Sequence, residues 1–433
     1  MAVPRDATSF DVPFDIASVR ADFPILGEQV NGAPLVYLDS AATSQKPHAV
    51  LDAEASFLAR SNAAVHRGAH TLAADATDAF EDARVAVAAF VGADPDNLVW
   101  TSGATAGINL IAYSIGNASL GRGGEAARRF ALEPGDEIVV TEAEHHANLI
   151  PWQELAARTG AAMRHIPVLD DGRLDLDAAA GIVGARTRII AFPHVSNVLG
   201  IVNPVDDLVS LAHSVGALTV LDACQSAPHL ALDLAGLGVD LAVFSGHKVF
   251  APYGVGALYG RSEVLEALPP FLTGGSMITT VTLDAAEYLP PPQRFEAGTQ
   301  PVSQAIGLAA AVRYLGVLDH DAIAAREASL ERRLVAGLRE VPGVRILGDA
   351  AGVDRVALAA FDVDGVHAHD VGQFLDARGV AVRVGHHCAQ PLHRRFGLTA
   401  TVRASAAFYN TDDEIDTFLD ALSGVRAFFG VSA

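Results

Sequence analysis

Short apolar runs alternate with amphipathic stretches from about residue 95 to about residue 260, and this alternation constrains the fold most strongly. The runs are NLVWTSG, EIVVTE, RIIAFPHVSN, LTVLDAC, LAVFSGHK and VGALYG. Buried strands that alternate with helices are typical of a mostly parallel sheet covered by helices on both faces. The sequence therefore predicts an α/β fold with such a sheet at its centre.

Polar residues stand at the end of several of these runs. In open α/β sheets, ligand sites lie beyond the carboxyl ends of the strands. We therefore expect the polar side chains at these ends to meet in one crevice. They are Thr105, His145, Asn197, Asp222 and Lys248.

The pattern changes after LPPPQRF, where two long helical patterns, SQAIGLAAAVRYL and AREASLERRLVAGLREV, lead into shorter strand-like runs. We predict an N-terminal segment (1–30) that packs on a small domain, a large domain (31–304), and a small α+β C-terminal domain (305–433). Thr411 and Glu414 have the spacing of a capping box and predict the start of the last helix. The Gly- and Arg-rich segment 116–137 is predicted to be a solvated surface loop.

Charge and composition exclude several classes of function. The 433 residues include 30 basic and 51 acidic side chains, a net charge of -21, which disfavours binding to nucleic acid or to an anionic membrane. The N-terminus has no basic start followed by an apolar run, and no stretch of 18 uninterrupted apolar residues occurs, so we expect a cytoplasmic protein. The two cysteines, Cys224 and Cys388, predict reduced thiols, with a single disulfide as the alternative.

Lys248 and Asp222 form the most specific chemical pattern. A lysine at the end of an apolar strand suits Schiff-base chemistry, although most lysines are solvated surface groups. Asp222 ends another apolar strand, where a carboxylate needs a cationic partner. Such a pair is what pyridoxal phosphate requires: an amine for the Schiff base and a carboxylate that keeps the pyridine nitrogen protonated.

Other residues could hold the phosphate and the ring of such a cofactor. SGATAGIN follows a strand and opens a helix, so its backbone N–H groups and Thr105 could bind an anion, with Ser245 and His247 as further donors. His145 could stack on a flat ring and carry a proton. The histidine pairs 145–146 and 386–387 also allow a zinc reading, which we disfavour because adjacent strand residues point to opposite faces and further ligands are missing.

The residues around Cys388 in the sequence allow two interpretations of this cysteine. A free cysteine is usually a small buried hydrophobe. However, Cys388 stands near Arg383 in the turn RVGHHCAQPL, and a cation-rich turn with glycine can stabilise a nucleophilic thiolate.

Taken together, the motifs resemble one family. RADFPILGEQVNGAPLVYLDSAATSQKP, NAAVHRGAHTL, EHHANLIPWQEL, HVSNVLG, LDACQSAPH, SGHK, RFEAGT and RVGHHCAQPL occur in order from about residue 18 to the last helix. They resemble the pyridoxal-phosphate-dependent cysteine desulfurases of the SufS-like second group, which belong to the class-V aminotransferases of fold type I. The short segment after Cys388 is similar to the second group, because the first group has a longer loop there.

The resemblance implies roles at the matching positions. Lys248 matches the Schiff-base lysine, Asp222 the partner of the pyridine nitrogen, His145 the stacking histidine and proton shuttle, and Gln225 the ligand of the phenolic oxygen. Cys388 matches the cysteine that accepts sulfur. The remaining matches are Thr105, Ser245 and His247 at the phosphate, Thr299 reaching the phosphate of the other subunit, Asn197 and Arg403 at the substrate carboxylate, and His66 and Arg67 along the site.

The implied activity is conversion of L-cysteine to L-alanine, with a persulfide on Cys388. The implied partners are a second copy of the chain with shared active sites and a sulfur-acceptor protein for iron–sulfur cluster assembly. Selenocysteine lyase and cysteine sulfinate desulfinase are close alternatives, and a non-catalytic cofactor-binding scaffold is a distant one. One departure is Ala106, where relatives usually carry a glutamate after the threonine.

Overall fold

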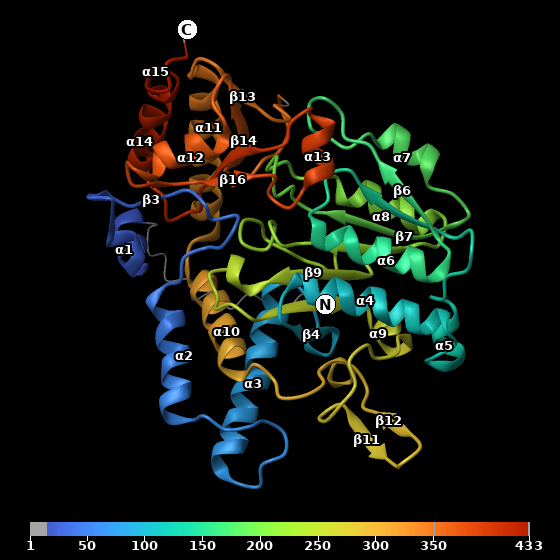
Figure 1. Cartoon of the computed structure of the whole chain (residues 1–433). Helices are drawn as coiled ribbons and strands as arrows, with labels where there is room; N and C mark the ends of the chain where they lie inside the picture. The colour runs from blue at the N-terminus through green and yellow to red at the C-terminus, as the bar shows by residue number, and fades with distance from the viewer. Residues whose placement is uncertain (1–14, 350, 432–433) are drawn as a thin grey trace.

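The computed structural model describes residues 15–349 and 351–431, and its largest sheet has seven strands (Figure 1). The strand β10 runs antiparallel to both of its neighbours, whereas the four pairs from β9 to β6 are parallel. The predicted α/β fold with a mostly parallel sheet is confirmed. The spatial order is β4 (Leu98–Thr101), β10 (Gly256–Gly260), β9 (Leu241–Ser245), β8 (Leu218–Asp222), β7 (Thr187–Pro193), β5 (Glu137–Thr141) and β6 (Ala162–Ile166).

Each of the six predicted apolar runs became a strand, because its side chains are buried on both faces of the sheet. Alternate residues of β9 illustrate this: Phe244 packs into the core on one face, and Val243 packs into the core on the other. The sequence did not predict β6. This edge strand exposes Arg164 and His165, so it lacks an apolar run.

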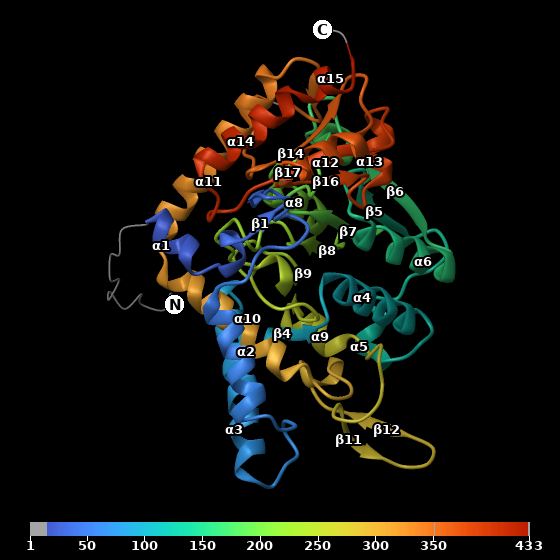
Figure 2. The ribbon, with the colours of Figure 1, turned by 60° about the vertical axis from the view of Figure 1, so that its left-hand side comes forward.

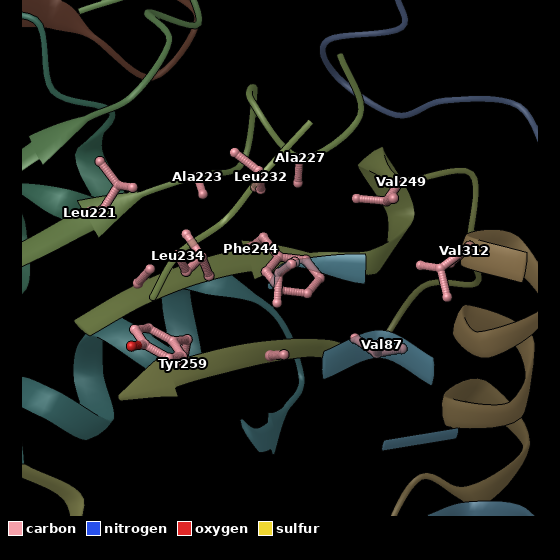
Figure 3. Packing of buried hydrophobic residues seen from close by; sticks show 14 of the residues in the cluster. Val87, Leu221, Ala223, Ala227, Leu232, Leu234, Phe244, Val249, Tyr259 and Val312 are labelled. Carbon is pink, nitrogen blue, oxygen red and sulfur yellow. The ribbon is translucent and has the colours of Figure 1, made fainter. Parts of the chain in front are cut away.

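Helices cover both faces of the sheet, as predicted. The helices α4 (Ala104–Ser119), α6 (Ile150–Thr159) and α9 (Ser262–Ala267) cover one face. The other face is covered by α3 (Thr71–Phe90), α7 (Leu176–Ile182), α8 (Val205–Ser214) and α10 (Val302–Val317), with α2 (His48–Arg60) against α10. Figure 3 shows part of the core on this other face, to which Val87 of α3, Val312 of α10, and Phe244 and Tyr259 of the sheet contribute.

A second sheet lies in the C-terminal part, at the top of Figures 1 and 2. It is antiparallel, in the order β13 (Val344–Ile346), β14 (Leu358–Val363), β17 (Thr401–Ser405) and β16 (Arg383–Gly385). The accompanying helices are α11 (His320–Glu340), α12 (Ala368–Asp376), α13 (Gln390–Arg395), α14 (Asp412–Ser423) and α15 (Val425–Phe428). Leu334, Phe361 and Phe418 belong to a separate core there, so this part has its own hydrophobic centre.

The predicted domain boundaries stay a prediction, and the packing shows where the two cores divide. The apolar residues of α10 and Ile323 of α11 belong to the core of the large sheet. The core of the C-terminal part takes Leu330 and later residues of α11, and also Val36 and Leu38 from near the N-terminus. Near the N-terminus, β3 (Val36–Tyr37) pairs in parallel with β15 (Val380–Ala381) of the C-terminal part. Of the N-terminal segment, residues 1–14 lie outside the described residues. In α1 (Ile16–Ala21), Arg20 bonds to the Tyr409 carbonyl at 2.8 Å and pairs with Glu414 at 2.9 Å.

Three smaller features complete the fold. The capping box of Thr411 and Glu414 is present at the start of α14, as predicted. Segment 116–137 is exposed over 120–126, but it is not simply a loop: it contains the end of α4 and the helix α5 (Gly124–Arg128). Two further antiparallel pairs are β1 (Gln29–Val30) with β2 (Ala33–Pro34) and β11 (Ile278–Val281) with β12 (Ala286–Tyr288). Across the described residues, we found no helix with the length and apolar character of a membrane span.

Candidate active site

A cavity of about 210 Å³ lies beyond the carboxyl ends of the strands of the large sheet. Its wall includes residues of the C-terminal part as well, so the two parts of the chain form it together. The five strand-end residues that were expected to meet do line this one cavity. The predicted site residues found in its wall are Thr105, His145, Asn197, Asp222, Gln225, Ser245, His247, Lys248, Cys388 and Arg403.

The N-terminus of α4 forms one end of the cavity. Its N-cap is Gly103, with φ of 145°, and the backbone N–H of Ala104 donates to Ser245 Oγ at 2.9 Å. Gly256 makes this approach of helix and strand possible, because a Cβ there would lie 2.7 Å from the Gly103 Cα. The first N–H groups of the 16-residue α4 and the Thr105 hydroxyl thus border the cavity, an arrangement that suits an anion.

His247 and Lys248 follow β9 in a 3-10 turn, Gly246–Lys248. The ring of His247 stacks on Tyr253, with 5.4 Å between the ring centroids. Burial, together with the charge on Lys248, lowers the pKa of His247 to about 4, so the ring is neutral at pH 7. Its Nδ1 atom is buried and has no hydrogen-bond partner within the described part of the chain.

Asp222 is the last residue of β8, and Gln225 lies on the turn that follows. Asp222 Oδ1 accepts a hydrogen bond from the Cys224 backbone N–H at 2.9 Å, which fixes the carboxylate at the strand end. Gln225 Nε2 donates to the Ala41 carbonyl at 2.8 Å. Among the described residues, none bonds to the buried Gln225 Oε1. Buried polar atoms are normally satisfied, so this atom indicates a site that a bound group completes.

His145 follows β5 and is neutral at pH 7. Burial, together with the charge on Lys248, lowers its pKa to about 4. Its Nδ1 atom accepts a hydrogen bond from the Ala147 N–H at 3.0 Å. A neutral imidazole that accepts at Nδ1 carries its proton on Nε2, so His145 is a proton donor at that atom.

A buried network behind His145 was missed by the sequence reasoning. Glu144 Oε1 accepts from the Thr141 hydroxyl at 2.8 Å, and Glu144 Oε2 accepts from Asn148 Nδ2 at 2.7 Å. Asn148 Oδ1 in turn accepts from Trp152 Nε1 at 3.0 Å. Complete burial raises the pKa of Glu144 well above its ordinary value. This network fixes the turn that carries His145.

Arg403 lies on β17 of the C-terminal part and contacts Asn197, which follows β7 of the large sheet. Arg403 Nη1 donates to the Asn197 carbonyl at 2.8 Å, and Arg403 Nη2 pairs with Asp39 Oδ1 at 3.3 Å. The Arg403 side chain is only 4% exposed, and burial lowers its pKa. Asp39 was not predicted, because it reaches Arg403 across 364 residues of sequence. It also lies 3.8 Å from Arg383, so it is the counter-charge of two arginines.

The two cysteines are free, as predicted, and they lie in very different surroundings. Cys388 is half-buried in the cavity wall on a loop where it and His387 adopt positive φ values of 55° and 49°. Cys224 is buried, and burial raises the pKa of its thiol to about 12. At pH 7 Cys224 is therefore a neutral thiol, which makes it a poor nucleophile.

Three predicted residues lie away from the cavity of their own chain. Thr299 is exposed just after the buried Glu296, and His66 and Arg67 are exposed in the segment before α3. His66 Nε2 lies 2.8 Å from Glu81, which pairs with the buried Arg84. Arg84 also pairs with Glu296 at 2.6 Å, so one charged network connects both segments.

Comparisons with known proteins agree with this geometry. The model of the family described as "Aminotransferase class-V" matches residues 36–418. The chain belongs to this family. It is 56% identical over 420 residues to the "Probable cysteine desulfurase 2" of Mycobacterium leprae, covering 96% of this chain and 98% of the relative. It is 48% identical to the "Probable cysteine desulfurase" of Streptomyces coelicolor, covering 96% and 98%.

Solved structures of the family have the same fold. The cysteine desulfurase CsdA of Escherichia coli, solved as an S-sulfonic acid, superposes with a TM-score of 0.85 at 38% identity, covering 96% of this chain and 99% of that one. The apo cysteine desulfurase of Thermococcus onnurineus superposes with a TM-score of 0.86 at 37% identity, covering 94% and 97%.

Cysteine desulfurases of this family use pyridoxal phosphate, and the cavity suits it. The α4 N-terminus with Thr105 and Ser245 offers phosphate donors, and Lys248 offers an amine in the same cavity as the Asp222 carboxylate. The unpartnered Gln225 Oε1 and His247 Nδ1 are further polar atoms for a bound group to complete. Among the described residues, no group of three or more His, Cys, Asp or Glu side chains could hold a metal ion.

Proposed function

We propose that this chain is a pyridoxal-phosphate-dependent cysteine desulfurase that moves sulfur from L-cysteine to Cys388 and releases L-alanine. One observation carries the proposal: Lys248, Asp222 and Cys388 line a single cavity, with Arg403 in the same wall. A scaffold protein would need no half-buried thiol there. An aminotransferase would have no use for a thiol beside its lysine.

Arg403 and Asn197 bind the substrate. The carboxylate of L-cysteine would lie against the guanidinium of Arg403, whose position is fixed by the Asn197 carbonyl and by Asp39. Charge-assisted hydrogen bonds to arginine fix orientation as well as affinity. The substrate sulfur would then point toward Cys388 in the same wall.

Lys248 Nζ takes the proton from Cα of the bound substrate. When bound, the cofactor supplies an electron sink for the pair left at Cα, and Asp222 keeps the pyridine nitrogen protonated. The Cys388 thiolate attacks the substrate sulfur: the S–S bond forms as the Cβ–S bond breaks, and the electron pair of that bond stays with carbon. His145, with its proton on Nε2, donates the proton that this carbon needs. The product then leaves as alanine.

The remaining assignments are part of the same proposal. Ser245, His247 and Thr105 hold the phosphate, and Gln225 holds the phenolic oxygen. The short segment between Cys388 and α13 supports placement in the SufS-like second group. The persulfide would go to a sulfur-acceptor protein for iron–sulfur cluster assembly in the cytoplasm. Cys224 is structural.

We further propose a homodimer with shared active sites. The support is that Thr299, His66 and Arg67 are exposed away from their own cavity. Their two segments are connected by a charged network that runs from His66 through Glu81 and Arg84 to Glu296. Mixing inactive Lys248→Ala with weakened Thr299→Val tests this. A mixed dimer would contain one site with both a wild-type Lys248 and a wild-type Thr299, so activity should rise above that of either variant alone. Unchanged activity in a dimer shown to have exchanged subunits would contradict the shared site.

The desulfurase itself is tested with substoichiometric L-cysteine and no reductant. The wild-type holoenzyme should release alanine and gain the mass of one sulfur atom on the peptide that contains Cys388. Cys388→Ala should keep the visible absorbance of the bound cofactor and release no alanine. Cys224→Ala, the matched control, should keep this absorbance and still release alanine. Alanine release by Cys388→Ala at the wild-type rate would refute the mechanism. Turnover of selenocysteine or cysteine sulfinate by Cys388→Ala would not, because these substrates have better leaving groups.

A further inference from the structure

The loop that carries Cys388, residues 386–390, has a backbone conformation that needs support from outside. We call it the nucleophile loop. His387 and Cys388 have φ values of 49° and 55°, which are uncommon for residues other than glycine. Such conformations persist where the surrounding structure holds them in place.

His146 makes two hydrogen bonds to this loop. Its backbone N–H donates to the Cys388 carbonyl at 2.6 Å, and its Nε2 atom accepts from the Gln390 backbone N–H at 3.1 Å. Its ring also lies beside that of His386, with 5.4 Å between the centroids. Both hydrogen bonds hold the chain just C-terminal to the α-carbon of Cys388, and the ring contact with His386 lies on the N-terminal side.

The position of His146 in the chain gives these contacts a second consequence. It directly follows His145, whose Nδ1 is fixed by the Ala147 N–H in the same turn. The hydrogen bonds of Glu144 to Thr141 and Asn148 stabilise this turn. The hydrogen bonds of His146 thus set the nucleophile loop relative to the turn of the proton-donating histidine.

The other supports of the loop come from elsewhere. Asn197 Nδ2 donates to the His387 carbonyl at 2.7 Å, and the His387 ring bonds to Thr401 at 2.9 Å. Neither contact reaches Cys388 or Gln390. Loss of the His146 ring would therefore leave the Gln390 end of the loop without its side-chain acceptor.

We propose that His146 is a positioning residue for the sulfur-transfer step, holding the nucleophile loop against the His145 turn so that the Cys388 thiol faces the substrate sulfur. This inference rests on the proposed function and adds to it a residue that touches neither substrate nor cofactor. It predicts that the acceptor atom of residue 146 matters, and that its ring alone does not.

The test compares three holoenzymes: His146→Phe, which keeps a ring without an acceptor, His146→Gln, which keeps an acceptor, and the exposed strand residue His165→Ala as control. The first measurement is the rate at which iodoacetamide alkylates Cys388, read by peptide mass. The second is kcat and KM for L-cysteine, and the third is the visible absorbance of the cofactor.

His146→Phe should lower kcat by about tenfold and leave KM within about a factor of two, because one hydrogen bond is worth roughly that factor and substrate binding is not touched. Cys388 alkylation should become several-fold faster as the loop opens. His146→Gln should recover most of both effects, and His165→Ala should match wild type. Cofactor absorbance should be the same in all.

Two results would overturn the proposal. One is wild-type kcat and alkylation rate in His146→Phe. The other is loss of cofactor absorbance in both His146→Phe and His146→Gln, which would place the residue in cofactor binding or folding. The alkylation rate needs no turnover. If wild type failed to desulfurate cysteine, the proposed function would fail while the loop contact could still be judged.

Discussion

Replacement of Asp39 by asparagine tests the charge balance of the cavity. Asp39 pairs with the 4%-exposed Arg403 at 3.3 Å and lies 3.8 Å from Arg383, and its own side chain is 18% exposed. Asp39→Asn keeps the shape and an acceptor oxygen but removes the counter-charge. Arg403 would then be a buried cation with one carbonyl partner, that of Asn197.

The size of the effect follows from the burial of the two partners. Removing one partner of a fully buried ion pair costs about 3–5 kcal/mol. Asp39 is partly exposed and asparagine still accepts a hydrogen bond, so we expect Asp39→Asn to lower the free energy of unfolding by about 2 kcal/mol. A carboxylate ligand bound at Arg403 would replace the lost charge. The difference from wild type should therefore shrink when the product, L-alanine, is present.

Urea denaturation of the cofactor-free chain, with and without L-alanine, measures both quantities. Asp362→Asn is a suitable control, because Asp362 pairs with an exposed arginine, Arg345, at 3.9 Å and should cost less than about 0.5 kcal/mol. Equal losses for the two variants would refute the reasoning. So would a loss for Asp39→Asn that L-alanine leaves unchanged although it still binds.

Three further outcomes are expected. Arg403→Lys should raise KM for L-cysteine by about tenfold or more in steady-state assays, since one ammonium cannot bond to the Asn197 carbonyl, Asp39 and a substrate carboxylate together; an unchanged KM would remove Arg403 from the substrate site. Cys224→Ala should keep activity within a few-fold and cost on the order of 1 kcal/mol of stability in urea. His194 is neutral in the folded chain because burial lowers its pKa from 6.5 to about 4. The unfolded chain therefore binds more protons at this residue between these values, and the contribution of His194 to stability should rise by about 3 kcal/mol from pH 4 to pH 6.5. His194→Gln should flatten that rise in urea titrations at each pH, and an unchanged slope would contradict the assignment.

The sequence predicted the sheet and the strand-end residues because both depend on local patterns. Apolar runs predicted β4, β5 and β7 to β10, and the topological rule then placed His145, Asp222 and Lys248 in one cavity. The edge strand β6 was missed because its adjacent residues Arg164 and His165 are polar and exposed, which interrupts any apolar run. The helix α5 was missed because Gly121 and Gly123 precede it and Gly124 is its first residue.

Residues whose position depends on distant parts of the chain could not be predicted in this way. Asp39 follows β3, which pairs with β15 of the C-terminal part, and Asp39 itself bridges to Ser405 of β17, the strand that carries Arg403. Similarly, nothing in EHHANLIPW shows that the second histidine bonds to the backbone at Cys388 and Gln390. The roles taken from the family resemblance remain predictions, including those of Thr299, His66 and Arg67.

The cavity is assembled from two parts of the chain, and this has a mechanical consequence. Lys248 and His145 come from strand ends of the large sheet, whereas Cys388 and Arg403 come from the C-terminal part. Polar contacts between the two sides at the cavity include His146 to Cys388, Asn197 to His387, and Arg403 to Asn197. Apolar residues of the C-terminal part, such as Leu392 and Phe408, also pack into the core of the large sheet. Because the groups proposed to hold the phosphate and ring belong to the large sheet, weakening these polar contacts should impair sulfur transfer before it impairs cofactor binding.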